Sequence, residues 1–139
     1  MAPERAATPG GPQVRFLSFA NQSEMPSRYL LADLFVLPSR GFYETWGLAV
    51  NEAMHMGVPC IVSELVGCQK DLVTQGETGW VFDPSRPGAL GSALSEALGA
   101  LASPPRRAEI RSAVEKRISG YTYAQTTDGL VAALGALQA

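Results

Sequence analysis

The sequence lacks dense clusters of positive charge and long unbroken apolar runs. Its 11 lysines and arginines are outnumbered by 13 aspartates and glutamates, which gives a net charge of −2. Because nucleic-acid binding depends on basic side chains that neutralise phosphates, we expect no nucleic-acid partner. The longest apolar stretch, YLLADLFVLP, is interrupted by Asp33 and Pro38, well short of the roughly 20 residues that cross a bilayer. The sequence therefore predicts no transmembrane segment, and without the apolar core of a signal peptide near its start we expect a cytoplasmic protein.

Histidine and cysteine are also scarce, which limits metal and nucleophilic chemistry. The chain has one histidine and two cysteines. Cys60 and Cys68 lack the Cys-x-x-Cys spacing of zinc sites, so we expect free thiols. His55 follows Glu52 by three residues, but Glu-x-x-His sites that bind iron need two such motifs. A lone histidine also argues against a hydrolase built on a His base, and we predict neither a metal nor a cofactor.

Four short apolar runs predict β-strands in a single domain. Hydrophobic residues form 46% of the 139 residues, which is enough for one core. Residues 1–13 are expected to be a disordered leader, and residues 14–139 to form the domain. The run at 34–39 is continuous, as in a parallel strand buried on both faces. The four runs are VRFLSF (14–19), LFVLPS (34–39), PCIVSE (59–64) and GWVFD (79–83).

Helical patterns lie between and after these runs. Ser23 is expected to cap a first helix, with Pro26 in its first turn. A second helix extends from Gly47 to Met56 and stops at a left-handed Gly57. The alternation predicts an α/β fold: half of a Rossmann-like, doubly wound domain with about four parallel strands flanked by helices, and a helical C-terminal end. A short helix is also predicted at 68–75. Three further helices at the C-terminal end are predicted from apolar stripes, whose residues recur at helical spacing: Leu90, Leu94, Leu98, Leu101; Ile110, Val114, Ile118; and Tyr123, Thr127, Leu130, Val131, Leu134, Leu137.

The run GFYETWGLAVNEAM, residues 41–54, places two acids around the start of the second helix. Glu44 precedes the helix at the carboxyl end of a predicted strand, and Glu52 lies in its second turn. Ligands of open α/β sheets bind in that crevice, and the unpaired N–H groups of a helix N-terminus favour a phosphate or diphosphate. Gly47 would let a phosphate approach the backbone. Carboxylates suit hydroxyl groups rather than phosphate, so the combination indicates a nucleotide sugar.

These segments resemble a known family. The runs VRFLSF, RYLLADLFVLPS, ETWGLAVNEAMHMGVPCIVSELVG and GETGWVFD are similar to the C-terminal, donor-binding part of retaining glycosyltransferases of the GT-B fold, and most similar to glycosyltransferase family 4 (glycosyl transferases group 1). The most specific element is Glu44, seven residues and Glu52, with Trp46-Gly47-Leu48 at the helix start. The similarity extends over roughly residues 14–137.

The resemblance implies roles for five residues. Glu52 would bind the ribose hydroxyls of the donor, and Glu44 would contact the donor sugar near the reacting carbon in a catalytic supporting role. The N–H groups of Gly47 and Leu48 would face the diphosphate, and Trp46 belongs to the donor-binding motif, although packing alone also explains an aromatic residue there. The expected partner is a UDP, GDP or ADP sugar from which a hexosyl group is transferred, without a metal.

Two alternatives remain from the sequence. Complete enzymes of this type also have an acceptor domain and an Arg–Lys clamp on the diphosphate, neither of which precedes Val14, so the isolated chain is expected to be inactive and to need the missing N-terminal half. A non-catalytic module that associates with a second copy of itself is the alternative function. A flavodoxin-like phosphate-binding domain is disfavoured, because ANQSEM contains no glycine-rich loop.

Overall fold

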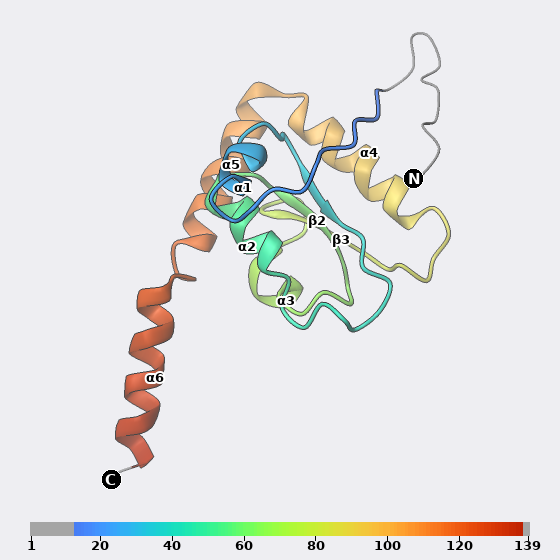
Figure 1. Ribbon diagram of the computed structural model, residues 1–139. Coiled ribbons are helices and arrows are strands. Elements are labelled where there is room, and N and C mark those ends of the chain that lie inside the picture. Colours follow the sequence, from blue (N-terminus) through green and yellow to red (C-terminus); the bar gives the residue numbers. More distant parts are fainter. Residues whose placement is uncertain (1–12, 138–139) are drawn as a thin grey trace.

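The computed structural model describes residues 13–137, so the leader expected at 1–13 lies outside the described residues except for Gln13. Strands and helices alternate through the middle of the chain, and three helices follow (Figure 1). In chain order the elements are α1 (Met25–Tyr29), β1 (Phe35–Leu37), α2 (Leu48–His55), β2 (Cys60–Ser63), α3 (Gln69–Leu72), β3 (Gly79–Phe82), α4 (Ala89–Leu101), α5 (Pro104–Ile118) and α6 (Tyr123–Leu137).

The strands form one parallel sheet in the order β1-β2-β3, with three strands rather than the four expected. Phe35 pairs with Cys60 in the register of the first two strands, and Ile61 pairs with Trp80 in the next. Every residue of β2 is buried, whereas β1 is half-buried along its length. The run at 34–39 is predicted to form a strand buried on both faces, but β2 is the fully buried strand. Strand β2 lies between two strands, whereas β1 lies at the edge of the sheet.

The strand predicted at 14–19 is wrong. This segment is not part of a strand and has no ladder of hydrogen bonds, and its side chains are exposed, with Phe19 at 93%. A hydrogen bond from the Arg28 guanidinium to the Ser18 carbonyl oxygen, 2.7 Å, connects it to α1. Aromatic and β-branched residues favour a strand only where a neighbouring strand supplies the other half of the ladder.

The start of α1 differs from the expected Ser23 cap. The Asn21 side-chain oxygen accepts a hydrogen bond from the Glu24 N–H, 3.1 Å, and the Glu24 carboxylate accepts one from the Asn21 N–H, also 3.1 Å. Ser23 donates its hydroxyl to the same Asn21 oxygen instead of capping the helix. This reciprocal pair is a capping box shifted two residues toward the N-terminus, and Pro26 lies in the first turn as predicted.

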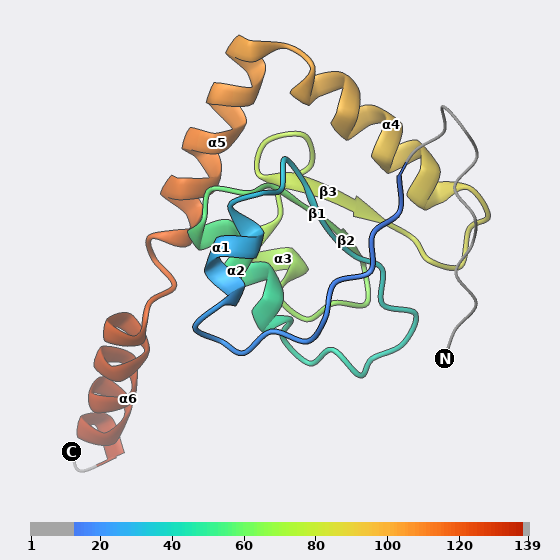
Figure 2. The same ribbon diagram turned by 45° about the horizontal axis from the view of Figure 1, so that its top comes forward.

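Helices α1 to α5 pack with the sheet around a single core. Helix α2 contacts β1 and β2, α4 contacts β3, and α5 contacts both α2 and α4. Figures 1 and 2 show α4 and α5 following one another along one side of the molecule. The largest fully buried side chains include Trp80, Met54 and Ile61. The predicted α/β class with a parallel sheet flanked by helices and a helical C-terminal end is confirmed.

Two of the C-terminal stripes are only partly buried, or not at all. In α4 the buried face consists of Ala93, Ala97 and Leu101, so the predicted leucine stripe is rotated and Leu98 is 58% exposed. Helix α6 has no buried residue, and it extends away from the rest of the fold in both views. Across residues 13–137, no helix combines the length and the apolar character needed to cross a membrane.

Candidate functional site

The loop before α2 reaches the helix through Gly47, whose backbone is left-handed with φ +98°. A Cβ at this position would lie 2.8 Å from Cγ1 of Val66, so a larger residue would meet both backbone strain and the core. The interior of the fold therefore requires glycine here in its own right, and the expectation that Gly47 also lets a phosphate approach the backbone stays a prediction. The first N–H groups of α2, those of Leu48 and Ala49, have no acceptor within the helix.

A second loop fixes the backbone around Glu44. The Gly67 N–H donates to the Glu44 carbonyl oxygen, 3.0 Å, and the Cys68 N–H donates to that of Trp46, 2.8 Å. A Cβ on Gly67 would collide with the carbonyl group of Thr45, so the two loops approach as closely as glycine allows. The Glu44 side chain is half-buried. Burial, followed by the charges of Asp71 and Glu44, raises the pKa of the Cys68 thiol to about 11.

Trp46 is fixed by two contacts that the sequence did not indicate. Its indole N–H donates to the Asn51 side-chain oxygen, 2.7 Å, and its ring lies 6.2 Å from that of Tyr121 at an interplanar angle of 33°. Asn51 directly precedes Glu52 in the motif, and a polar residue on this apolar helix was the one local sign of a hydrogen-bond partner for Trp46 there. Tyr121 follows α5, seventy-five residues after Trp46, and nothing in its local sequence links it to α2.

Glu52 receives a hydrogen bond from a tyrosine. The Tyr29 hydroxyl donates to Oε2 of Glu52 at 2.9 Å. Tyr29 is 5% exposed and packs edge-on against Phe35 with ring centroids 5.6 Å apart. Burial, together with the bond to Glu52 and its charge, raises the pKa of Tyr29 to about 12. A half-buried carboxylate on an apolar helix thus has the partner that its desolvation requires.

One cavity of about 440 Å³ joins α2 to the segment that leads into α6. Of the five predicted site residues it brings together Trp46, Leu48 and Glu52; Glu44 and Gly47 do not line it. His55 is at its edge, with Nε2 3.3 Å from the Tyr121 carbonyl oxygen. The lining residues are Gln22, Trp46, Leu48, Asn51, Glu52, His55, Tyr121, Thr122, Tyr123 and Thr126.

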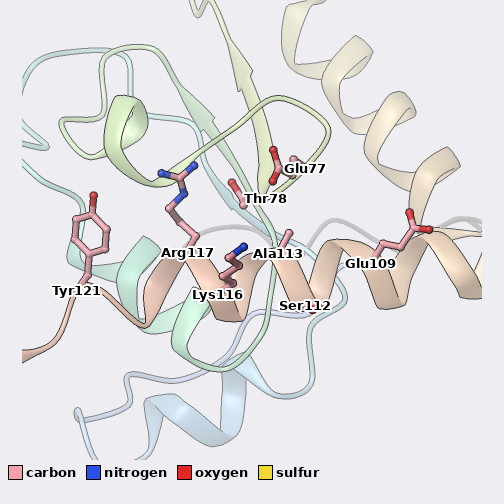
Figure 3. Close-up of a pocket in the computed structure, with 8 residues that line it drawn as sticks. All are labelled: Glu77, Thr78, Glu109, Ser112, Ala113, Lys116, Arg117 and Tyr121. Atoms are coloured by element: carbon pink, nitrogen blue, oxygen red, sulfur yellow. The ribbon is translucent and has the colours of Figure 1, made fainter.

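A second cavity, of about 640 Å³, lies between α5 and the turn that precedes β3 (Figure 3). None of the five predicted site residues lines it. Its Arg117 donates to the Asp71 carbonyl oxygen at 3.4 Å and to the Thr74 hydroxyl at 3.2 Å, and its Thr78 hydroxyl donates to the Leu72 carbonyl oxygen at 2.8 Å. These polar groups hold the turn in place, so the cavity beside α2 is the better candidate site. Within residues 13–137, no three side chains of the His, Cys, Asp and Glu types gather as a metal site requires.

Comparison with known proteins identifies the family. The model of the family described as glycosyl transferases group 1 matches residues 5–117. The chain belongs to this family. Among similar proteins, the O-antigen chain mannosyltransferase B of Escherichia coli is 33% identical over 61% of this chain and 21% of its own length. The D-inositol 3-phosphate glycosyltransferase of Corynebacterium diphtheriae is 31% identical over 88% of this chain and 27% of its own.

A solved structure agrees with the sequence relatives. The sucrose-phosphate synthase of Thermosynechococcus elongatus is similar with a TM-score of 0.68 and 27% identity, over 88% of this chain and 30% of that one. The resemblance to a C-terminal domain of a GT-B glycosyltransferase is thereby confirmed. The chain spans about a fifth to a quarter of the two curated relatives named above.

Proposed function

We propose that this chain is the donor-binding portion of a retaining glycosyltransferase, and that a nucleoside diphosphate sugar binds in the cavity beside α2. The observation that carries the proposal is that Leu48, at the N-terminus of α2, and the Glu52 carboxylate line the same cavity. Glu52 follows Leu48 by four positions, so the two residues lie on one face of the helix about 6 Å apart along its axis. This spacing matches a ligand with an anionic group and a hydroxyl-bearing ring.

Each end of the site would bind a different part of the donor. The free N–H groups at the start of α2 and the positive end of the helix dipole would stabilise the diphosphate, including its charge as it leaves, without a metal. Glu52 would accept hydrogen bonds from the ribose hydroxyls. Glu44, outside the cavity but fixed through its carbonyl oxygen, would contact the transferred hexosyl group, and Trp46 would form one wall.

The proposal covers residues 14–139 as one donor-binding domain of the family 4 type, in the cytoplasm. The acceptor site and the remaining diphosphate contacts would come from the rest of a longer enzyme, so this chain alone would bind the donor without transferring the sugar. Support for this division comes from the share of the relatives that the chain matches, between 21% and 27% of the two curated proteins.

The test is a titration of the chain with UDP, GDP and ADP at millimolar concentration, followed by amide NMR. We expect one of the three to shift the resonances of Gly47, Leu48 and Glu52. Glu52→Gln should lower the affinity for this nucleotide about tenfold, because a hydrogen bond to a charged group contributes about 1.5 kcal/mol or more. Glu77→Gln, an exposed glutamate at the other cavity, is the matched control. An absence of shifts with all three nucleotides, or equal losses in both variants, contradicts the proposal.

A second candidate function is self-association as a non-catalytic module. The favouring observation is apolar exposure in two places, segment 14–19 and helix α6, where Phe19 and Leu137 are 93% and 84% exposed. Large exposed apolar surfaces commonly mark protein contacts. Light scattering across a hundredfold range of protein concentration separates the candidates, since this one requires the mass to rise above that of a single chain. A constant monomer mass counts against it.

A further inference from the structure

The contact between Tyr29 and Glu52 joins helices α1 and α2, across 23 positions of the sequence. Helix α1 packs on α2, and the Tyr29 hydroxyl lies 2.9 Å from Oε2 of Glu52. Among the side-chain hydrogen bonds of residues 13–137, this is the bond that reaches the Glu52 carboxylate. Tyr29 itself does not line the cavity, so its effect on any ligand there has to pass through Glu52.

Tyr29 is held rigidly enough to orient its partner. Its ring is 5% exposed and packs edge-on against Phe35 of β1. The reciprocal bonds between Asn21 and Glu24 fix the start of α1, and Arg28 ties the helix to the Ser18 carbonyl oxygen. A buried side chain with only two torsions loses little further freedom when it donates a hydrogen bond. The phenol also remains protonated, and therefore a donor, throughout the neutral range.

An ionised carboxylate has about four acceptor positions on its two oxygens. The Tyr29 bond occupies one position on Oε2, which leaves Oε1 and the second position on Oε2 for a ligand. Two hydroxyl groups on adjacent carbons match two neighbouring acceptors of one carboxylate. A carboxylate free to rotate would accept the same hydroxyls, but it would have to be ordered at each binding event.

We propose that Tyr29 is a positioning residue: its hydroxyl fixes the Glu52 carboxylate so that the site selects ribose, with two adjacent hydroxyls, over 2′-deoxyribose. The inference rests on the proposed donor site and specifies which residue gives that site its preference for the sugar of the nucleotide. Tyr29→Phe removes the donor and keeps the ring that packs on Phe35. A purely structural role of Tyr29 would weaken the binding of ribose and deoxyribose ligands equally, whereas positioning affects the ribose ligand more, because 2′-deoxyribose keeps only one of the two hydroxyls.

The experiment measures the affinity of the full chain for UDP, GDP and ADP and for their 2′-deoxy counterparts by calorimetry. In Tyr29→Phe the binding of the ribonucleotide should weaken about tenfold, as for the loss of a group that orients a ligand-binding side chain, while the binding of its deoxy counterpart, which has one hydroxyl fewer for Glu52, should weaken less. Tyr43→Phe, at a 93% exposed tyrosine, serves as the control. In a Glu52→Gln background, Tyr29→Phe should have no further effect. A second readout needs only Glu52→Gln: the pKa of Tyr29, which is about 12 with the glutamate present, should fall when that charge is removed.

The outcomes separate the two proposals. If the unmodified chain binds a ribonucleotide and Tyr29→Phe leaves the ratio between ribose and deoxyribose ligands unchanged, the positioning role is overturned and the donor site stands. Additive losses in the double variant, or an unchanged titration of Tyr29 in Glu52→Gln, overturn it as well. If the unmodified chain binds none of the nucleotides, the donor site is overturned and the positioning role with it.

Discussion

Helices α2 and α6 have similar apolar sequences but opposite surroundings. Helix α2 has eight residues, of which Val50, Ala53 and Met54 are buried. Helix α6 has fifteen residues, and none of them is buried. Helix α2 contacts two strands and α5, whereas α6 extends away from the fold (Figures 1 and 2). Apolar periodicity therefore predicts that a segment is helical, but not what covers it.

The difference has an energetic consequence. Burial of apolar surface contributes about 25 cal/mol per Å², so the buried face of α2 stabilises the domain directly. Leu134 in α6 remains 53% exposed, and Gly129 and Gly135 reduce the helix propensity of its segment. Isolated helices of about 15 residues are marginal in water. The donor site of the proposed function is thus built on a helix that is packed into the core, unlike α6.

The largest expected effect is the loss of stability when a large apolar side chain is truncated in α2 rather than in α6. Met54 is fully buried, so Met54→Ala should lower the free energy of unfolding by about 3 kcal/mol through lost burial and the cavity left behind. The matched control is Leu134→Ala in α6, which should change it by less than about 0.5 kcal/mol. Urea unfolding followed by circular dichroism measures both.

Equal losses in the two variants would contradict this comparison, because they would require α6 to be covered as fully as α2. Repeating the measurement over a range of protein concentrations tests one source of such cover. A loss in Leu134→Ala that appears only at high concentration would indicate a second copy of the chain packed on α6.

The same contrast explains how far the sequence predicts the structure. Continuous apolar runs located β1, β2 and β3 because each of these strands has a neighbour to pair with. The run at 14–19 has the same character and remains unpaired, since a local pattern carries no information about a partner. Helix positions were predicted for the same local reason, whereas the buried face of α4 depends on its contacts with β3 and α5.

The candidate site likewise has a part that the local sequence predicts and a part that depends on contacts between distant residues. The motif with Glu44, Trp46 and Glu52 was visible from residue types and spacing within a single stretch. The bond from Tyr29 to Glu52 was not, because it joins residues 23 positions apart on different helices. The steric reason for glycine at position 47 was not visible either, since the packing of Val66 against it depends on the return of the chain after β2.

Glycine substitutions sharpen the comparison with opposite signs. Gly47→Ala places a side chain at φ +98° and 2.8 Å from Val66, so it should cost about 2 kcal/mol of unfolding free energy through left-handed strain and overpacking. In α6, a Cβ at Gly135 meets no atom within 4 Å. Gly135→Ala should therefore increase helical ellipticity and stabilise α6 by about 0.5 kcal/mol or slightly more, because alanine loses less backbone freedom than glycine. If both substitutions destabilised the protein, α6 would have to be packed against something at Gly135, and the contrast between a helix fixed by the core and a helix standing apart from it would no longer hold.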